Sequence, residues 1–212
     1  MSQFEEQAEV AGIAAAALEH LGIAGDDRFC AALAAYAGEI CRANRRTNLT
    51  GARDPAAFAR GPLFDALTLL PVLGDGSPLV DVGSGGGLPG VPAALWRPGL
   101  RVSLVEPRPL RAAFLRRAVA ALGIAAEVIE GKDAALPDGA FAVACSQAVW
   151  PAPEWLARAV RLVRPGGAIT ALASAPIDDG AVPSGCGIEA RFETRRPSDG
   201  APRFAVRVRR RE

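Results

Sequence analysis

This chain of 212 residues has one histidine and one lysine, and its cysteines are not spaced in pairs. The four cysteines, Cys30, Cys41, Cys145 and Cys186, form no C-x-x-C pair, so neither a zinc ribbon nor a redox motif is written here. We expect four reduced, mostly buried thiols. The only histidine, His20, lies in an alanine-rich helical pattern. This scarcity excludes histidine-based metal clusters and most Ser-His or Cys-His triads, and we predict no metal site.

Signals for a membrane or for secretion are also missing from the sequence. No apolar run reaches the roughly 18 residues of a membrane helix, since even "AGIAAAALEHLGIAG" is interrupted by Glu19 and His20. The N-terminus "MSQFEEQAEV" is acidic and lacks the basic start and apolar middle of a signal peptide. Hydrophobic residues make up 50% and charged residues 22%, as in soluble globular proteins. We therefore expect a cytoplasmic monomer that contacts no membrane.

Positive charge is carried almost entirely by arginine, because Lys132 is the only lysine. The net charge of +1 does not by itself indicate a polyanionic partner. The arginines gather in two clusters, one comprising Arg42, Arg45, Arg46, Arg53 and Arg60, the other Arg203, Arg207, Arg209, Arg210 and Arg211. A guanidinium matches phosphate geometry, but GC-rich codon usage also enriches arginine. The clusters alone leave a nucleic-acid surface undecided.

Helical patterns fill the first third of the chain. Ala/Leu-rich stretches predict helices over about 4–21 and 27–43, and "GIAGDD" supplies a turn and an N-cap aspartate. "NRRTNLTGARDP" is typical of a loop, and Asp54-Pro55 opens a third predicted helix to about Leu73. We predict an N-terminal helical extension over residues 1–74.

The pattern changes at Leu79, where short apolar runs begin to alternate with amphipathic stretches. The runs are "LVDV", "RVSLVE", "AEVIEG", "FAVACS" and "AITALAS", with helices expected from about Pro89, over about 108–122 and over about 154–163. This alternation predicts a mostly parallel sheet covered by helices on both faces. "GIEARFETRR" and "PRFAVRVRRR" around "PSDGA" predict a C-terminal antiparallel hairpin. The fold class is therefore α/β and Rossmann-like, with its ligand-binding domain over residues 75–212.

Three glycines, Gly83, Gly85 and Gly87, follow the first predicted strand at alternate positions. Glycine permits positive φ and lets a ligand lie against bare backbone, next to the N-terminus of the following helix. Because Gly85, Gly87 and Gly90 also fit G-x-G-x-x-G, the glycines alone do not separate a nicotinamide cofactor from S-adenosylmethionine.

Three further features favour S-adenosylmethionine. Asp81, two positions before the first glycine, suits a cationic amino acid moiety and would repel a pyrophosphate. The loop follows about eighty residues that are mostly helical in pattern, whereas a nicotinamide domain usually opens with its strand. "LVRPGGAITAL" places a Pro-Gly-Gly turn before a late strand, which recurs in S-adenosylmethionine-dependent methyltransferases.

Two acidic residues at predicted strand ends complete the expected cofactor site. Glu106 ends the second strand, where a carboxylate can accept both ribose hydroxyls; the alternative is an exposed strand-end charge. Asp133 follows the third strand and could accept the adenine amino group, with Ala134 offering backbone; the alternative for Asp133 is a helix N-cap.

Four segments in order, "NLTGARDP", "DVGSGGGLPGVPAAL", "RVSLVEPRPLRAAFLRRA" and "FAVACSQA", resemble the RsmG (GidB) family. Those enzymes use S-adenosylmethionine to methylate N7 of a guanine in small-subunit ribosomal RNA. The likeness runs from about Arg42 to Ser174, and the glycines followed by Leu88-Pro89-Gly90-Val91-Pro92 are its most specific piece. The resemblance implies that residues 75–212 form a methyltransferase domain whose partner is ribosomal RNA or the small ribosomal subunit.

The resemblance also assigns roles to single residues. It implies that Gly83, Leu88 and the backbone of Asp133 and Ala134 contact the cofactor, and that Arg111 matches the basic residue of the family's "KR" segment. We predict that Gln147 and Asp65 are catalytic. The residues predicted to bind RNA are Asn48, Arg45, Arg46, Arg53, Arg60, Arg111 and Trp150. Trp150 either stacks on the target guanine or packs against Trp155 and Pro151.

The acceptor half departs from the family pattern at three places. Gly61 stands where the family has histidine, Gln147 replaces an arginine, and "ALAS" lacks the family's lysine after the fifth strand. These departures keep three alternatives open: a divergent paralogue acting on another RNA or a small molecule, a non-catalytic RNA-binding protein that retains the cofactor pocket, and a nicotinamide-dependent oxidoreductase.

Overall fold

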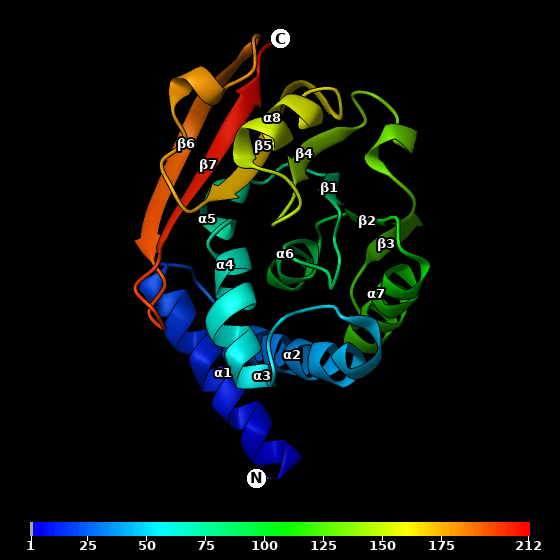
Figure 1. Ribbon diagram of the computed structural model, residues 1–212, viewed down its shortest axis with the longest axis vertical. Helices are drawn as coiled ribbons and strands as arrows, with labels where there is room; N and C mark the ends of the chain where they lie inside the picture. Colours follow the sequence, from blue (N-terminus) through cyan, green and yellow to red (C-terminus); the bar gives the residue numbers. More distant parts are fainter. Residues whose placement is uncertain (1) are drawn as a thin grey trace.

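Seven strands form one sheet in the order β3-β2-β1-β4-β5-β7-β6 in the computed structural model, which describes residues 2–212 (Figure 1). The strands are β1 (Leu79–Val82), β2 (Val102–Glu106), β3 (Ala126–Glu130), β4 (Phe141–Cys145), β5 (Val163–Ala173), β6 (Cys186–Arg195) and β7 (Pro202–Arg210). β1 to β5 pair in parallel, while β7 pairs antiparallel with both β5 and β6. The predicted α/β fold with a C-terminal hairpin is confirmed. The strand order reverses between β1 and β4, which places a crevice at the carboxyl ends of these two strands.

Helices cover both faces of the sheet, as the alternation of side chains along each strand requires. Leu79 of β1 packs with α1 (Gln3–His20), α2 (Asp27–Thr47), α6 (Gly90–Trp96) and α7 (Pro109–Leu122). Val80, the next residue, packs on the other face with α8 (Ala152–Ala159). Asp26 caps α2 by accepting the Phe29 N–H at 2.8 Å, as the sequence predicted.

The N-terminal helices belong to the same core as the sheet. Val10, Tyr36 and Leu63 lie in one continuous hydrophobic cluster with Leu79 of β1 and Val143 of β4. The four cysteines are unpaired, and all but Cys41 are buried. The helical extension therefore stabilises the sheet from one face instead of standing apart from it.

The third predicted helix is broken into pieces. It consists of α3 (Pro55–Phe58), a π-helical turn over Ala59–Leu63, α4 (Phe64–Leu67) and α5 (Leu70–Leu73). Pro62 has no N–H to donate and lies inside the π-helical turn, which explains the break. The prediction of one regular helix to Leu73 was therefore wrong in detail.

Two other predicted boundaries also move. α2 continues to Thr47 and ends at Asn48 in the left-handed conformation (φ 46°), so Arg45 and Arg46 lie on a helix and not in a loop. α8 ends at Ala159, and β5 takes in the Pro-Gly-Gly segment as a register shift opposite β4. A proline and two glycines interrupt a ladder without ending the strand.

One stretch of the described chain, Pro55–Leu73, reaches membrane-spanning length and composition, with a mean hydropathy of 1.3. The sequence analysis stated that no run does so, and this is a correction. Of that window 61% is buried inside the fold, and core helices of soluble proteins pass the same test. Its two charges are both paired, Arg60 with Glu9 and Asp65 with arginines of the hairpin.

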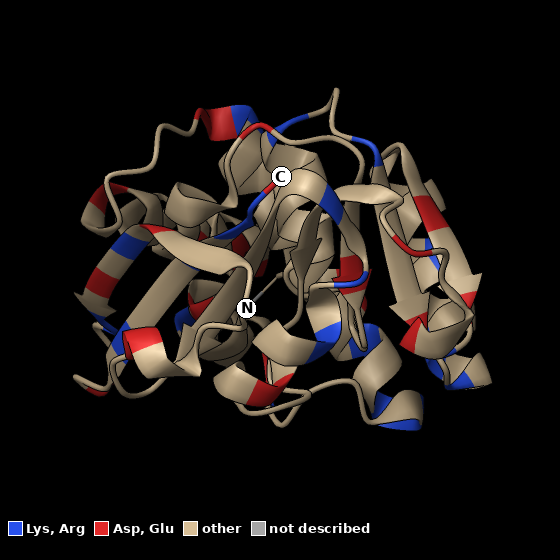
Figure 2. Ribbon diagram, turned by 90° about the horizontal axis from the view of Figure 1, so that it is seen from above, with Lys and Arg blue, Asp and Glu red and all other residues tan. Residues whose placement is uncertain are grey.

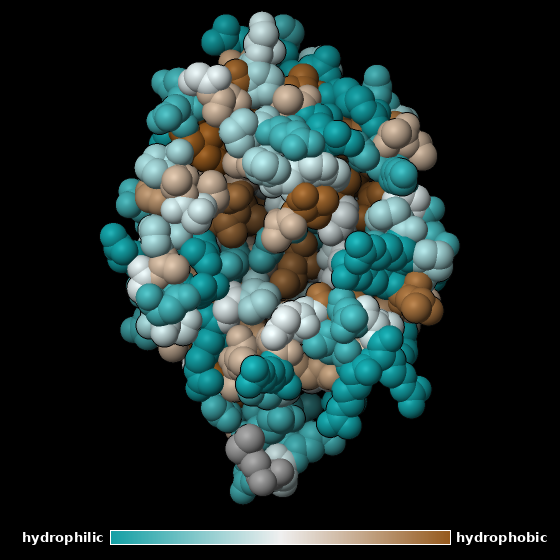
Figure 3. Space-filling view, viewed as in Figure 1, coloured by the Kyte–Doolittle hydropathy of each residue, from teal (hydrophilic) through white to brown (hydrophobic). Residues whose placement is uncertain are grey.

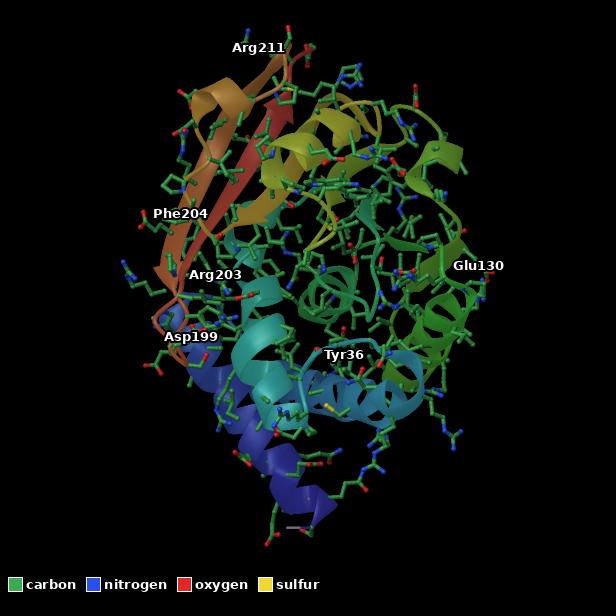
Figure 4. The ribbon with its side chains drawn as sticks, viewed as in Figure 1. Tyr36, Glu130, Asp199, Arg203, Phe204 and Arg211 are labelled. Carbon is green, nitrogen blue, oxygen red and sulfur yellow. The ribbon has the colours of Figure 1, made fainter. Side chains whose placement is uncertain are left out.

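The C-terminal hairpin is fastened to α4 by one carboxylate. Arg203 of β7 donates to Asp65 through Nε to Oδ1 (2.7 Å) and Nη2 to Oδ2 (3.1 Å), and Arg196 adds a contact from Nη1 at 3.2 Å. Arg203 and Asp199 lie beside α4 at the left of Figure 4. The three interacting side chains are only 12% to 18% exposed. Such a bidentate pair, shielded from water, joins elements far apart in the sequence.

We predict that Asp65→Asn lowers the free energy of unfolding by about 2 to 3 kcal/mol, because it leaves the partly buried guanidinium of Arg203 without a countercharge, while Arg196 keeps its ion pair with Asp199. Urea denaturation measures the loss. Asp179→Asn is the control, since its ion pair with Arg191 is exposed and should contribute little. Equal losses in the two variants would contradict an anchoring role for Asp65.

Candidate functional site

A cavity of about 240 Å³ lies at the carboxyl ends of β1 and β4, at the expected crevice. We call it the loop cavity. It is lined by Ile40, Leu49, Thr50, Phe58, Pro62, Gly83, Ser84, Gly85, Gly86, Leu88, Arg111, Gln147, Ala148 and Val149. Figure 3 shows a hollow near the middle of this face, floored by hydrophobic side chains, between the elements labelled α4, α6 and α8 in Figure 1.

A second cleft of about 610 Å³ adjoins the loop cavity, and we call it the outer cleft. Gln147 and Ala148 line both spaces, and Asp65, Trp150 and Arg203 line only the outer cleft. A larger cavity of about 670 Å³ lies near Ala24, Trp96 and Leu122, where helices end at the amino edge of the sheet. No predicted site residue lines this larger cavity. The two joined spaces at the carboxyl edge are therefore the candidate site.

The glycine loop offers bare backbone to the loop cavity. Gly83, Gly85 and Gly87 have φ values of +73°, +56° and +107°, a region that disfavours any side chain. A Cβ at Gly83 would approach Val149 Cγ2 to 2.6 Å. A Cβ at Gly85 would meet nothing nearer than Arg111 Nη1 at 3.7 Å, which is an ordinary van der Waals contact, so the face of this residue is not blocked. The predicted close approach of a ligand to the loop is sterically allowed at Gly85.

Two buried carboxylates hold the loop from behind. Asp81 Oδ2 accepts the Gly90 N–H at 3.0 Å, and Glu106 accepts the N–H groups of Gly85 and Arg108, both at 2.9 Å. Glu106 is 3% exposed, which excludes the alternative of an exposed strand-end charge. A carboxylate has about four acceptor positions, so Glu106 keeps capacity for ribose hydroxyls. That contact stays a prediction.

Asp81 is completely buried and does not line the loop cavity. Burial raises its pKa to about 8, outweighing the Gly90 N–H bond, which lowers it. Its Oδ1 atom has no hydrogen-bond partner among the described residues. In this structure Asp81 positions the first turn of α6, and its predicted contact with a cationic ligand group stays a prediction.

Sequence reasoning missed Tyr36, which ties α2 to the glycine loop. Its hydroxyl donates to the Gly86 carbonyl at 2.8 Å, and the ring is fully buried. Tyr36 is labelled above α2 in Figure 4, on the side that faces the sheet. Ile40, one turn further along, lies 2.8 Å from where a Gly86 Cβ would be. The available signal was that the only tyrosine of the chain sits in an alanine-rich helix.

Asn44 is a second positioning residue that the sequence analysis missed. Its Oδ1 accepts the N–H groups of Leu49 (2.7 Å) and Thr50 (3.0 Å), and its Nδ2 donates to the Thr50 carbonyl at 2.8 Å. These bonds fold the segment after α2 against the loop cavity. An asparagine as the first residue of the predicted loop "NRRTNLTGARDP" was the sequence signal for this role.

Two residues predicted to act on the substrate, Arg111 and Gln147, line the loop cavity from different elements. Arg111 of α7 donates from Nη2 to the Asn48 carbonyl at 2.7 Å, joining α7 to the end of α2. Gln147 donates from Nε2 to the Pro62 carbonyl at 3.1 Å, while its Oε1 is buried without a partner. The Gln147 carbonyl oxygen is therefore a hydrogen-bond acceptor in need of a donor.

Other predicted residues lie outside the cavity. Arg45 and Arg46 flank a groove between α2 and α7, Arg53 lies on the neighbouring surface, and Arg60 pairs with Glu9 at 3.1 Å. Asp133 and Ala134 form a short 3-10 helix after β3, at the same edge of the sheet. Asp133 pairs with Arg158 at 3.5 Å and caps no helix, so the N-cap alternative is wrong.

Two predicted site residues already have partners within the fold. Trp150 stacks on Trp155 with ring centroids 5.6 Å apart, and the Arg158 guanidinium lies 4.9 Å from the Trp150 centroid. The Trp155 ring is stacked on the indole, which favours the packing alternative, while stacking on the target guanine stays a prediction. The Asp65 carboxylate is taken up by Arg203 and Arg196, so in this structure it anchors the hairpin, and its predicted catalytic role stays a prediction.

We predict that Tyr36→Phe lowers the free energy of unfolding by about 1 to 2 kcal/mol, because the Gly86 carbonyl loses its buried donor. It should also weaken S-adenosylmethionine binding by up to about tenfold, the factor that about 1.4 kcal/mol represents. Calorimetry measures the affinity. The control is Thr68→Val, which removes a buried hydroxyl bonded to the Phe64 carbonyl away from the cavity. If both variants bind the cofactor alike, Tyr36 does not position the loop.

The raised pKa of Asp81 predicts a pH-dependent stability. Between about pH 4 and pH 8 the folded protein keeps a proton that the unfolded chain releases, so this contribution to stability is complete below pH 4 and is lost as the pH rises through 8. As the pH rises from 5 to 8, the unfolding free energy of the native protein should therefore fall relative to that of Asp81→Asn, by up to about 1.4 kcal/mol per pH unit. Urea denaturation of both proteins from pH 5 to 8 measures this difference. If the unfolding free energies of the two proteins change equally with pH, Asp81 is ionised when folded.

Comparisons with known proteins agree with this geometry. A family model described as rRNA small subunit methyltransferase G (GidB) matches residues 29–179. A protein of Neisseria meningitidis serogroup C (strain 053442), named Ribosomal RNA small subunit methyltransferase G, is 36% identical over 158 residues, which cover 74% of each chain. A protein of the same name from Stenotrophomonas maltophilia (strain K279a) is 38% identical over 177 residues, 81% of each chain.

Solved structures support the fold. A methyltransferase from Pyrococcus furiosus superposes with a TM-score of 0.58 at 14% identity, over 82% of this chain and 95% of that one. The 1,6-didemethyltoxoflavin-N1-methyltransferase of Burkholderia thailandensis, solved with S-adenosylhomocysteine, gives 0.52 at 17% identity, over 90% and 92%. At sequence identities this low, the structural likeness shows the fold alone. The match over residues 29–179, together with relatives that are identical at more than a third of the aligned positions, shows that the chain belongs to the GidB family of small-subunit ribosomal RNA methyltransferases.

Proposed function

We propose that this protein transfers a methyl group from S-adenosylmethionine to small-subunit ribosomal RNA, with N7 of a guanine as the acceptor. The observation that carries this is the wall of Gln147 and Ala148 shared by the loop cavity and the outer cleft. A cofactor in the first space and a base in the second would meet at this wall. The relatives' name, Ribosomal RNA small subunit methyltransferase G, supports the same substrate.

The residues of the loop cavity fit the cofactor. Gly85 lines the cavity and no atom lies closer than 3.7 Å to its Cβ position, so a ligand's amino acid part can lie against the loop backbone near Gly83 and Leu88. Glu106 lies directly behind Gly85 with acceptor capacity for hydroxyl groups. The backbone of Asp133 and Ala134, after β3, would lie at the adenine end. When bound, S-adenosylmethionine supplies an electrophilic methyl group on a sulfonium centre.

Methylation at N7 places modest demands on the protein. The N7 lone pair is free at neutral pH, so no general base is required; the new bond to N7 forms as the bond to sulfur breaks, and the positive charge passes to the base. The protein must hold the two partners in line and exclude water. Ile40, Leu49 and Phe58 supply an apolar lining, and Gln147 offers an amide to orient the acceptor.

The acceptor must come from unpaired RNA. In an A-form helix the guanine N7 lies in a groove too deep and narrow for side chains to reach. A guanine in a loop or bulge can instead turn out of its stack and enter the outer cleft. The volume of about 610 Å³ is large enough for a base, and the one aromatic side chain that lines it, Trp150, is already stacked on Trp155. Recognition therefore depends on hydrogen bonds and on contacts to the RNA backbone.

We predict that Gly85→Asp abolishes methyl transfer, because a side chain there projects into the loop cavity and adds a negative charge. The assay uses radiolabelled S-adenosylmethionine with small-subunit ribosomal RNA that lacks the modification, and nuclease digestion identifies 7-methylguanosine. Gly123→Asp is the matched control, since Gly123 also has a positive φ (+63°) and has nothing within 4 Å of a Cβ. The two variants share the backbone strain and differ only in the cavity.

Three outcomes would contradict the proposal in different ways. Transfer of label to another nucleotide would show that the acceptor half has diverged. Cofactor binding by calorimetry without transfer to any RNA would support a non-catalytic RNA-binding protein. Equal activity of Gly85→Asp and the native protein would show that the loop cavity is not the cofactor site.

A further inference from the structure

The two arginine clusters of the sequence differ in whether their side chains are paired in the fold. In the C-terminal cluster, Arg203 pairs with Asp65, and Arg207 and Arg209 pair with Glu189. Arg210 donates to the carbonyls of Val160 and Val163. This cluster is largely taken up in holding the hairpin to the sheet. It has little free positive charge to offer a partner.

The other cluster flanks a groove. The ends of α2 and α7 enclose a space of about 560 Å³, walled by four arginines, Arg42, Arg45, Arg46 and Arg117, with one carboxylate, Glu39. Glu39 pairs with Arg42 at 2.6 Å. Among residues 2–212, Arg45, Arg46 and Arg117 have no carboxylate within salt-bridge distance. We call this space the arginine groove. Figure 2 shows basic and acidic residues interspersed over most of the ribbon, so an unbalanced group of this kind is local.

Unpaired arginines in this number call for a partner. Arg42, Arg45 and Arg46 are spaced i, i+3 and i+4, so their side chains share one helix face and repel one another. Arg45 and Arg46 lie in the last turn of α2, where the helix dipole favours cations, and this explains part of the clustering. It does not explain Arg117, which comes from the middle of α7 and faces the same groove. Beside it Leu110 is 69% exposed.

The arginine groove adjoins the loop cavity. Thr47 lines the groove and Leu49 lines the cavity, while Leu110 lines the groove and Arg111 the cavity. Between them, Arg111 donates to the carbonyl of Asn48, the residue between Thr47 and Leu49. Hydrophilic side chains project over α2 and α7 at the lower right of Figure 3, on the face that carries the central hollow. A chain that entered the site could therefore continue into the groove.

We propose that the arginine groove binds the phosphate backbone of the RNA strand that carries the target guanine. This rests on the proposed function and adds where the RNA lies: along α2 and α7, and not along the C-terminal hairpin. Guanidinium groups bind phosphate oxygens in fork geometry, and the exposed Leu110 can contact a sugar or base of unpaired RNA. Phosphate contacts set the register of the strand, and the cleft then selects the base.

The test compares two triple variants with the same change in charge. The groove variant is Arg45→Gln/Arg46→Gln/Arg117→Gln. The control variant is Arg28→Gln/Arg101→Gln/Arg164→Gln, three exposed arginines near the amino edge of the sheet. Binding of a fluorescein-labelled small-subunit ribosomal RNA transcript is measured over a range of KCl concentrations. Circular dichroism and S-adenosylmethionine calorimetry confirm that each variant is folded and binds cofactor as the native protein does.

The groove variant should bind RNA about 10- to 100-fold more weakly near physiological salt, and the slope of log affinity against log salt should fall by about 2 to 3. The control variant should change neither by more than about twofold. Native-like RNA binding by the groove variant, or equal losses in both variants, would overturn the proposal. Loss confined to intact small subunits, with free RNA bound normally, would assign the groove to a ribosomal protein instead.

Methylation by the native protein separates this proposal from the function beneath it. If the native protein methylates the RNA and the groove variant does so equally well at low RNA concentration, the groove does not bind the RNA, but the proposed function is still supported. If the native protein neither binds nor methylates ribosomal RNA, the proposed function fails and the groove assignment fails with it.

Discussion

The site depends on how a backbone without side chains is held in place. Gly83, Gly85 and Gly87 leave the loop after β1 with few contacts of its own, so its path is set by hydrogen bonds to peptide groups. Asp81 and Glu106 accept N–H groups from behind the loop. Both carboxylates are buried, where each hydrogen bond is electrostatically stronger than in water and an unpaired group is costly. The loop is thereby preorganised before any ligand arrives.

The same constraint explains why the N-terminal helices belong to the site. Tyr36 reaches from α2 to the Gly86 carbonyl, Ile40 closes the space beneath Gly86, and Asn44 folds the following segment against the cavity. A loop held only by the sheet would lack its contacts on this face. The helices that precede the sheet are therefore structural parts of the cavity, although no predicted cofactor residue lies in them.

The sequence predicted what local rules determine and missed what tertiary packing decides. The parallel sheet, the glycine loop and the hairpin follow from short-range patterns, and each is present. The roles of Trp150 and Asp65 depend on which partners the folded chain brings to them, Trp155 and Arg158 for one and Arg203, 138 residues away, for the other. The hydrophobic periodicity of a sequence does not reveal such side-chain contacts. Tyr36 was missed for the same reason, since its acceptor lies 50 residues away in the sequence.

The departures from the family pattern lie where the chemistry tolerates them. A reaction that needs a base would not survive the loss of histidine and lysine near the acceptor, but attack by a free lone pair needs only alignment. Gln147 provides an amide at the wall shared by the two spaces, one end of it bonded to Pro62 and the other unpaired. A neutral amide orients a base without attracting phosphate. The positive charge that RNA requires then has to come from elsewhere on the protein, and in this fold arginines left without carboxylate partners flank the adjoining groove.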